Sequence, residues 1–163
     1  MSTDDHSTRA QNIVTLNQLV QDNGNTNVLL VHAIAERVGL SASEFECWSL
    51  IADTGPMTVG ELAKHCRITS GGMTGMVDRL ERAGFVRREA DPRDRRRVIV
   101  RTADKSPELS ATLQKIQTMY NPLLEQFNLL LAEFSDEQIT FLMKFIVQTN
   151  VMFRATLEAL PEK

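Results

Sequence analysis

Residues 58–102, TVGELAKHCRITSGGMTGMVDRLERAGFVRREADPRDRRRVIVRT, decide the fold of this chain. Thr58 and Glu61 have the spacing of a capping box, in which two side chains satisfy the free amides at a helix start. Thr69 is placed to cap a second helix after a short turn. Gly84 stands where a helix ends in a left-handed residue. The stretch therefore predicts two short helices joined by a tight turn.

The apolar residues of this stretch repeat first as in a helix and then as in strands. In the second helix they recur at i, i+3, i+4 and i+7, which predicts one buried stripe made of Met73, Met76, Val77 and Leu80. Residues 85–89 and 97–102 alternate like strands, with a charged turn over residues 90–96. Two helices followed by a basic hairpin predict a winged helix-turn-helix, whose second helix fits a DNA major groove. We interpret the chain as a DNA binder on that basis.

Further helices are predicted on both sides of this centre. Residues 1–8 are expected to be disordered, and helices over residues 10–22 and 27–38 are expected to be separated by the Asn/Gly-rich segment 22–27. Capping boxes and a helix-starting proline place three more helix starts, at Ser41 with Glu44, at Ser106-Pro107 and at Ser135 with Gln138. The predicted fold class is mainly α with a small β-hairpin wing. Its DNA-binding domain spans residues 39–104.

The helices at the two chain ends carry broad apolar belts. Apolar residues alternate at intervals of four and three residues from Leu109 to Phe134, and the last helix has two apolar stripes. This surface exceeds what the central segment can cover. We therefore predict that residues 9–38 and 105–160 form a homodimerisation region, with an intramolecular helix bundle as the alternative. A dimer places two recognition helices one DNA turn apart, as a pseudo-palindromic site requires.

Composition indicates a globular protein with an uneven charge distribution. The 163 residues are 42% hydrophobic and 24% charged, with a net charge of −3. Residues 67–101 contain ten arginines and five acidic residues, so this segment is positive and the rest of the chain is negative. Because salt screens charge over about 8–10 Å, the electrostatic field near residues 67–101 affects phosphate binding more than the net charge of the whole chain does. The alternative is that these charged residues only form a solvated surface. No membrane span or targeting peptide is recognisable, and the two cysteines are no disulfide framework, which favours a cytoplasmic protein.

The helix-turn-helix and its wing resemble the multiple-antibiotic-resistance regulator (MarR) family of bacterial transcription factors. The wing matches that family's D-x-R-D-x-R pattern through Asp91, Arg93, Asp94 and Arg96, and residues 77–81 are also typical. The resemblance spans residues 27–160. It implies a homodimeric regulator, most often a repressor, that binds a palindromic operator of double-stranded DNA. It also implies release from DNA by a small aromatic or phenolic effector.

Several residues of the recognition helix and wing are candidates for DNA contact. Each glycine in a helix costs about 0.8–1.0 kcal/mol of stability relative to alanine. We therefore hypothesise that the three glycines of the recognition helix let its backbone approach DNA closely. The alternative is that they have no functional role. Ser70 and Thr74 are expected to donate hydrogen bonds, and wing arginines to reach a minor groove. Asp78 is expected to pair with a wing arginine, which the family suggests is Arg96. The predicted DNA-binding set is Thr69, Ser70, Gly71, Gly72, Thr74, Gly75, Arg79, Arg93, Arg95 and Arg96.

The remaining candidates concern an effector, a metal and a thiol switch. His32, Trp48 and Tyr120 are candidates for an effector pocket, although each is also explained as a core residue. The three histidines lack ligand spacing, so no metal and no cofactor is predicted. Of the two cysteines, Cys66, beside Arg67, is the better candidate for a redox sensor, with a buried apolar role as the alternative. No nucleophile with a base is recognisable, so we predict no enzyme. A winged-helix module that binds protein is the other alternative.

Overall fold

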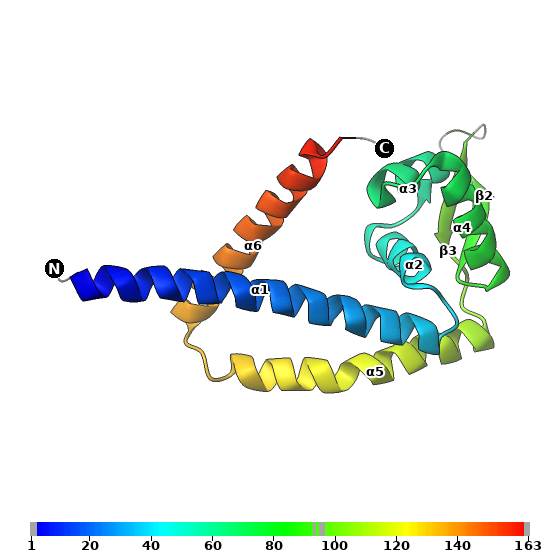
Figure 1. The fold of residues 1–163 in the computed structure, drawn as a ribbon. Coiled ribbons are helices and arrows are strands. Elements are labelled where there is room, and N and C mark those ends of the chain that lie inside the picture. The colour runs from blue at the N-terminus through cyan, green and yellow to red at the C-terminus, as the bar shows by residue number, and fades with distance from the viewer. Residues whose placement is uncertain (1–2, 93, 95–96, 162–163) are drawn as a thin grey trace. The chain divides into compact units, whose positions relative to one another are not determined.

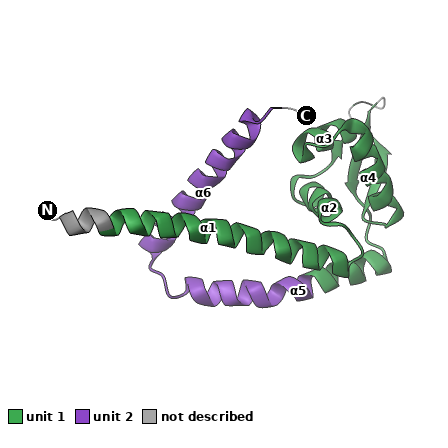
Figure 2. Ribbon diagram, in the orientation of Figure 1, with its two compact units in different colours: residues 1–116 green, residues 117–163 purple. Residues whose placement is uncertain are grey.

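The computed structural model describes residues 3–92, 94 and 97–161. They divide into two compact units, residues 1–116 and 117–163 (Figure 2). Along the chain the elements are α1 (Thr3–Arg37), α2 (Ala42–Thr54), β1 (Met57–Thr58), α3 (Val59–Cys66), α4 (Ser70–Arg82), β2 (Val86–Ala90), β3 (Val98–Thr102), α5 (Pro107–Leu131) and α6 (Asp136–Ala159) (Figure 1). The mainly α fold with a small β wing is confirmed. The boundary between the units lies inside α5, whereas the sequence analysis divides the chain at residue 105.

Local signals in the sequence correctly place the starts of α2, α3, α4 and α6. Both hydrogen bonds of a capping box are present at Ser41, Thr58 and Ser135, which begin α2, α3 and α6. The Thr69 side chain caps α4, as predicted. Gly84 adopts the left-handed φ of +78° and ends the helix-turn-helix.

The wing belongs to a three-stranded antiparallel sheet with the order β1-β3-β2. Val100 of the central strand is paired with Met57 on one side and with Arg88 on the other. The predicted hairpin of β2 and β3 is present, and the two-residue strand β1 adds an edge that the sequence analysis did not include. Because β1 leads directly into α3, the sheet fixes where the helix-turn-helix begins.

The core of the first unit lies between α2, α3, α4 and the sheet. The Trp48 ring packs between Phe45 and Phe85, with ring centroids 5.6 and 5.5 Å apart. The predicted stripe of α4 is buried, and its four side chains are at most 6% exposed: Met73, Met76, Val77 and Leu80. Burying an aliphatic side chain of this size stabilises a fold by about 1.5–3 kcal/mol. The inward stripe therefore leaves the opposite face of α4 exposed.

Helix α1 corrects two predictions. It runs unbroken through residues 22–27, so the predicted break there was wrong. The segment contains no proline, and each asparagine or glycine costs a helix about 1 kcal/mol or less. Ending one helix and nucleating another is less favourable. The helix also begins at Thr3, inside the tail that was predicted to be disordered.

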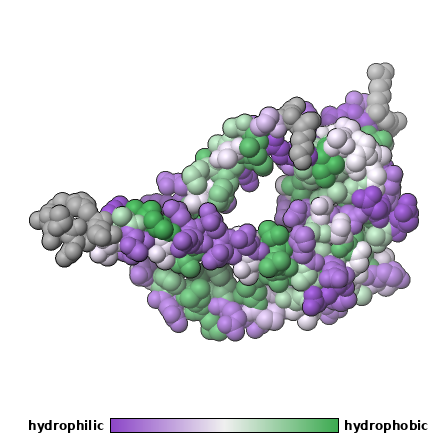
Figure 3. Space-filling view, in the orientation of Figure 1, coloured by the Kyte–Doolittle hydropathy of each residue, from purple (hydrophilic) through white to green (hydrophobic). Residues whose placement is uncertain are grey.

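The second unit consists of the end of α5 and the whole of α6. Helix α6 has no buried residue. Hydrophobic residues lie at the surface over α5 and α6 (Figure 3). Leu129, Phe141 and Val151, for example, are 68%, 67% and 62% exposed. Among the described residues, no helix is long and apolar enough to cross a membrane.

Candidate nucleic-acid interface

The exposed face of α4 is the centre of the candidate interface. The Thr69 hydroxyl oxygen accepts a hydrogen bond from the Gly72 amide at 3.2 Å, and the Thr74 hydroxyl donates to the Ser70 carbonyl at 2.9 Å. The predicted contact residues on this helix are exposed except for the half-buried Gly75: Thr69, Ser70, Gly71, Gly72, Thr74 and Arg79. They are therefore accessible to a partner, and their contact with DNA remains a prediction.

The three glycines of α4 differ in their surroundings. A Cβ at Gly72 would lie 3.0 Å from the Ile68 Cγ2 atom and 3.2 Å from the Thr69 hydroxyl oxygen, so the capped turn itself disfavours a side chain there. A Cβ at Gly71 would meet nothing within 4 Å, and one at Gly75 would meet only an arginine terminus at 3.7 Å. Packing within the protein thus explains Gly72, but not Gly71 or Gly75. The latter two are consistent with close approach by an external partner.

The turn before α4 has an unusual residue for its backbone conformation. Arg67 is left-handed, with φ 53° and ψ 40°. This conformation costs a residue with a side chain on the order of 1 kcal/mol. The turn nevertheless closes, because the Ile68 amide donates to the Ala63 carbonyl at 3.0 Å.

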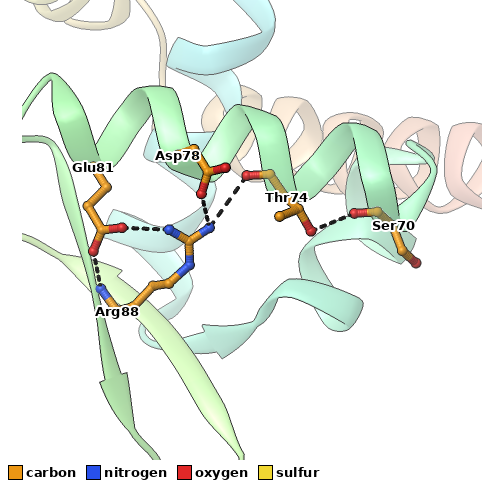
Figure 4. Close-up of polar contacts among 5 residues, drawn as sticks. All are labelled: Ser70, Thr74, Asp78, Glu81 and Arg88. Carbon is orange, nitrogen blue, oxygen red and sulfur yellow. Dashed lines mark hydrogen bonds and ion pairs between the residues drawn. The ribbon is translucent and has the colours of Figure 1, made fainter.

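Arg88 of β2 joins the wing to the recognition helix (Figure 4). Its guanidinium lies 2.6 Å from the Asp78 carboxylate and 2.5 Å from the Glu81 carboxylate, and its backbone amide donates to Glu81 at 2.9 Å. Burial alone lowers the pKa of Arg88, but its hydrogen bonds to Asp78 and Glu81 raise it above the ordinary value. One arginine thus compensates both acids of α4 and sets the angle between helix and wing.

The predicted partner of Asp78 was a wing arginine, and Arg88 on the first wing strand is such a residue. The specific pairing with Arg96 lies outside the described residues, as do Arg93 and Arg95. The sequence offers a signal for Arg88: it is two residues after the buried Val86, so both side chains share the strand face that meets α4. Arg88 was nevertheless not among the predicted site residues.

Arg79 anchors the other side of α4. Its guanidinium lies 2.5 Å from the Glu44 carboxylate, which also accepts hydrogen bonds from the Ser41 amide and hydroxyl at 2.9 and 2.8 Å. Burial raises the pKa of Glu44, but the hydrogen bonds from Arg79 and Ser41 outweigh it and lower the pKa below its usual value. Arg79 therefore has a scaffold role, while its side chain is still 55% exposed. The sequence predicted Glu44 as part of a capping box, but its ion pair with Arg79 was not predicted.

Several arginines of residues 67–101 form ion pairs within the described part of the chain. Besides those of Arg79 and Arg88, these pairs are Arg87 with Glu89 and Asp104, Arg97 with Glu61, and Arg101 with Glu89. Exposed pairs of this kind contribute about 0–1 kcal/mol each. They align the wing strands and reduce the positive charge available to phosphate. The local field is therefore weaker than the arginine count indicates.

The three predicted effector residues have different surroundings, and their role in effector binding remains a prediction. His32 lines a surface hollow of about 540 Å³ with Glu36, Leu40, Ser41, Ala42, Ser43 and Glu46. Trp48 is a core residue and does not line this hollow. Tyr120 belongs to the second unit, and burial raises the pKa of its hydroxyl. Of the two candidates in the first unit, His32 lines this hollow and Trp48 does not.

Neither a metal cluster nor a disulfide is present in the described part of the chain. No three histidine, cysteine or acidic side chains are grouped there as metal ligands. Cys47 is buried and Cys66 partly exposed, and both are free.

Comparisons with known proteins agree with this geometry. The model of the MarR family matches residues 40–98. The chain is 34% identical over 145 residues to the HTH-type transcriptional regulator YcgE of Bacillus subtilis strain 168. This match covers 89% of this chain and 90% of that protein. A MarR family protein from Bacillus stearothermophilus shares the fold with a TM-score of 0.65 at 21% identity, over 89% of this chain and 97% of that one.

A second structural match has been solved with DNA. It is a mutant MarR from E. coli complexed with operator DNA, with a TM-score of 0.56 at 22% identity, over 85% of this chain and 95% of that one. This match supports the fold. Together with the extended identity to YcgE, the family model and the winged helix-turn-helix show that the chain belongs to the MarR family of transcriptional regulators.

Proposed function

We propose that the protein is a repressor that binds a pseudo-palindromic operator as a homodimer and leaves it when a small aromatic effector binds. The exposed first turns of α4 carry this proposal. Gly71 and Gly75 lower helix propensity there, although no packing within the chain requires them. The amino end of a helix also presents free amides to phosphate. A helix that gives up stability on its exposed face is suited to close contact with a DNA backbone.

The charges around α4 support the same function. An acidic residue on a recognition helix repels phosphate, and Asp78 and Glu81 both lie on α4. Because Arg88 binds both carboxylates, its positive charge offsets their negative charge before DNA approaches the helix. The tip of the wing, with Arg93 and Arg95, is proposed to reach the minor groove.

The exposed apolar faces of α1, α5 and α6 support the homodimer. Monomeric proteins rarely leave large contiguous apolar surfaces in water. We propose that residues 9–38 and 105–160 cover these faces against a second copy of the chain. Two copies place two α4 helices on one side of the DNA, and an operator of two inverted half-sites follows.

The hollow at His32 supports an effector site. It is lined by Ser41, whose amide and hydroxyl bind Glu44, and Glu44 in turn binds Arg79 of α4. A ligand that competes for Ser41 would loosen this chain of contacts and change how α4 is held. Because Glu36 and Glu46 also line the hollow, we propose an uncharged phenol rather than an aromatic carboxylate as its ligand.

The test of the DNA contact uses two matched glycines. Gly71 and Gly60 are each the second residue of their helix, α4 or α3, and a Cβ at either meets nothing within 4 Å. Alanine at both positions should raise stability equally, by about 0.4–1 kcal/mol. Operator sequences are first selected from random DNA, and affinities are then measured by fluorescence anisotropy. Gly71→Ala should weaken binding at least tenfold, and Gly60→Ala should leave it unchanged.

Two results would contradict the proposal. If Gly71→Ala bound the selected DNA as tightly as the unchanged protein, the glycine would have no role in contact. If random DNA yielded no enriched sequence even in dilute buffer, the operator itself would be in doubt.

Two further experiments test the effector and the repressor role. Uncharged phenols and benzoates are compared for release of the selected DNA. The repressor role is checked by transcription in vitro from a promoter that contains the selected site.

A further inference from the structure

Glu44 is a buried carboxylate at the start of α2, although charged side chains are seldom buried without a partner. Its Oε2 atom accepts hydrogen bonds from the Ser41 amide and hydroxyl at 2.9 and 2.8 Å. Its Oε1 atom accepts a hydrogen bond from the Nε atom of Arg79 at 2.5 Å. The cap of α2 thus fixes one carboxylate oxygen, and the other binds the recognition helix α4.

Capping alone does not explain why this position holds an acid. Glutamine serves equally well in a capping box, as Gln138 does at the start of α6. Burial of a charge costs more free energy than burial of a neutral amide. The side chain of Glu44 is only 11% exposed, so its charge is better explained by Arg79 than by the cap.

Arg79 gives one of its donors to Glu44 and keeps others available. A guanidinium has five N–H donors in one plane. Among the described residues, no protein group forms a hydrogen bond with the two terminal nitrogens of Arg79. A Cβ on Gly75 would lie 3.7 Å from Nη1, so the guanidinium lies along α4 next to that glycine, and the side chain is 55% exposed. The terminal nitrogens are therefore accessible to a partner of α4.

We propose that Glu44 is a positioning residue for DNA binding, because it holds Arg79 with its two terminal nitrogens directed at one phosphate of the DNA backbone. Two parallel N–H donors match two phosphate oxygens. Arg79 lies in the last turn of α4, whereas the first residues of a recognition helix contact base edges, so a phosphate is its expected partner. This inference rests on the DNA binding put forward under Proposed function.

Holding the side chain in advance strengthens the contact. A long side chain loses rotational freedom when it binds, and this loss weakens affinity by about two- to tenfold for each side chain. The bond to Glu44 restricts Arg79 before DNA arrives, so part of that loss has already occurred in the free protein. Removal of the Glu44 charge also makes the surface more positive, which strengthens DNA binding in general. The overall affinity therefore combines two opposite effects, and the test must measure a single phosphate.

The experiment scans the selected operator with methylphosphonates, each of which replaces one charged phosphate oxygen by a neutral methyl group. We expect one phosphate in each half-site whose neutralisation weakens binding of the unchanged protein at least tenfold but that of Arg79→Ala less than twofold. At this phosphate, the weakening in Glu44→Gln should fall to about threefold, because Arg79 is present but no longer held. Glutamine keeps the cap of α2, and circular dichroism checks the fold of each variant.

Asp53→Asn is the matched control, since it also changes an acid of α2 into its amide, at an exposed position. It should show the same weakening as the unchanged protein. If Glu44 only held α4 in place, Glu44→Gln would change the overall affinity but not the weakening at this one phosphate, and that result would overturn the assignment. A phosphate scan that is identical in Arg79→Ala and the unchanged protein would overturn it as well. A selection that yields no operator would instead overturn the proposed function, and this inference with it.

Discussion

The winged helix-turn-helix buries its large apolar side chains, whereas the terminal helices leave many of theirs exposed. In the centre, Leu62, Met73 and Leu80 are fully buried. In α6, no residue is buried, and Phe141 and Val151 are 67% and 62% exposed. The centre thus contains its own core, whereas α6 leaves its apolar residues at the surface. If the proposed dimer covers them, the stability of the terminal helices depends on protein concentration and that of the centre does not.

The largest effect is expected in the centre. Leu80→Ala removes a fully buried side chain from α4, and such a cavity costs about 2–5 kcal/mol. Chemical denaturation should show this loss of unfolding free energy at every protein concentration. A loss confined to dilute samples would mean that the centre also depends on the dimer.

The next effect is expected at the terminal helices. Phe141→Glu places a charge on the exposed apolar face of α6 and should weaken the proposed dimer at least tenfold in sedimentation equilibrium, without changing the fold of the centre. Gln148→Glu adds the same charge at an exposed polar position of the same helix. The control should leave association unchanged. An unaltered dimer in Phe141→Glu would place the interface elsewhere.

A smaller effect is expected where the wing meets α4. Arg88→Ala leaves Asp78 and Glu81 without their shared partner, and we expect about tenfold weaker DNA binding by anisotropy. Stability should fall by less than about 1 kcal/mol, because both carboxylates are more than a third exposed. Arg87→Ala removes the same charge from the neighbouring position, whose partners are Glu89 and Asp104.

Two comparisons make the Arg88 prediction specific. Arg87→Ala should weaken DNA binding clearly less than Arg88→Ala. The double variant Arg88→Ala/Asp78→Asn should regain part of the affinity, because it removes one uncompensated acid. Equal losses in both arginine variants would indicate that only total charge matters.

The smallest effect concerns acid stability. The folded state lowers the pKa of Glu44, so its contribution to stability is present above the ordinary value of 4.5 and is lost as pH falls through the lower folded value. Glu44→Gln should therefore reduce the dependence of unfolding free energy on pH in that acidic range, by about 1 kcal/mol or less, since Arg79 is largely exposed. Glu46→Gln, which removes an exposed carboxylate from the same helix, is the matched control.

Much of the centre could be predicted because its signals are local. A capping box joins residues three apart, so Ser41 with Glu44 and Thr58 with Glu61 were readable directly from their spacing. The stripe of α4 follows from the helical period in the same way. The break at residues 22–27 was predicted wrongly because local propensity is weak, about 1 kcal/mol per residue, compared with the cost of interrupting a helix.

By itself, the sequence determined where α2 to α6 begin, the buried face of α4, the wing hairpin and the membership in the MarR family. Only the tertiary structure decided which distant groups meet: Arg88 with Asp78 and Glu81, and Arg79 with Glu44. The physical reason is sequence separation. Periodicity and capping act over three or four residues, whereas these pairs depend on how whole helices and strands pack, which no local spacing records.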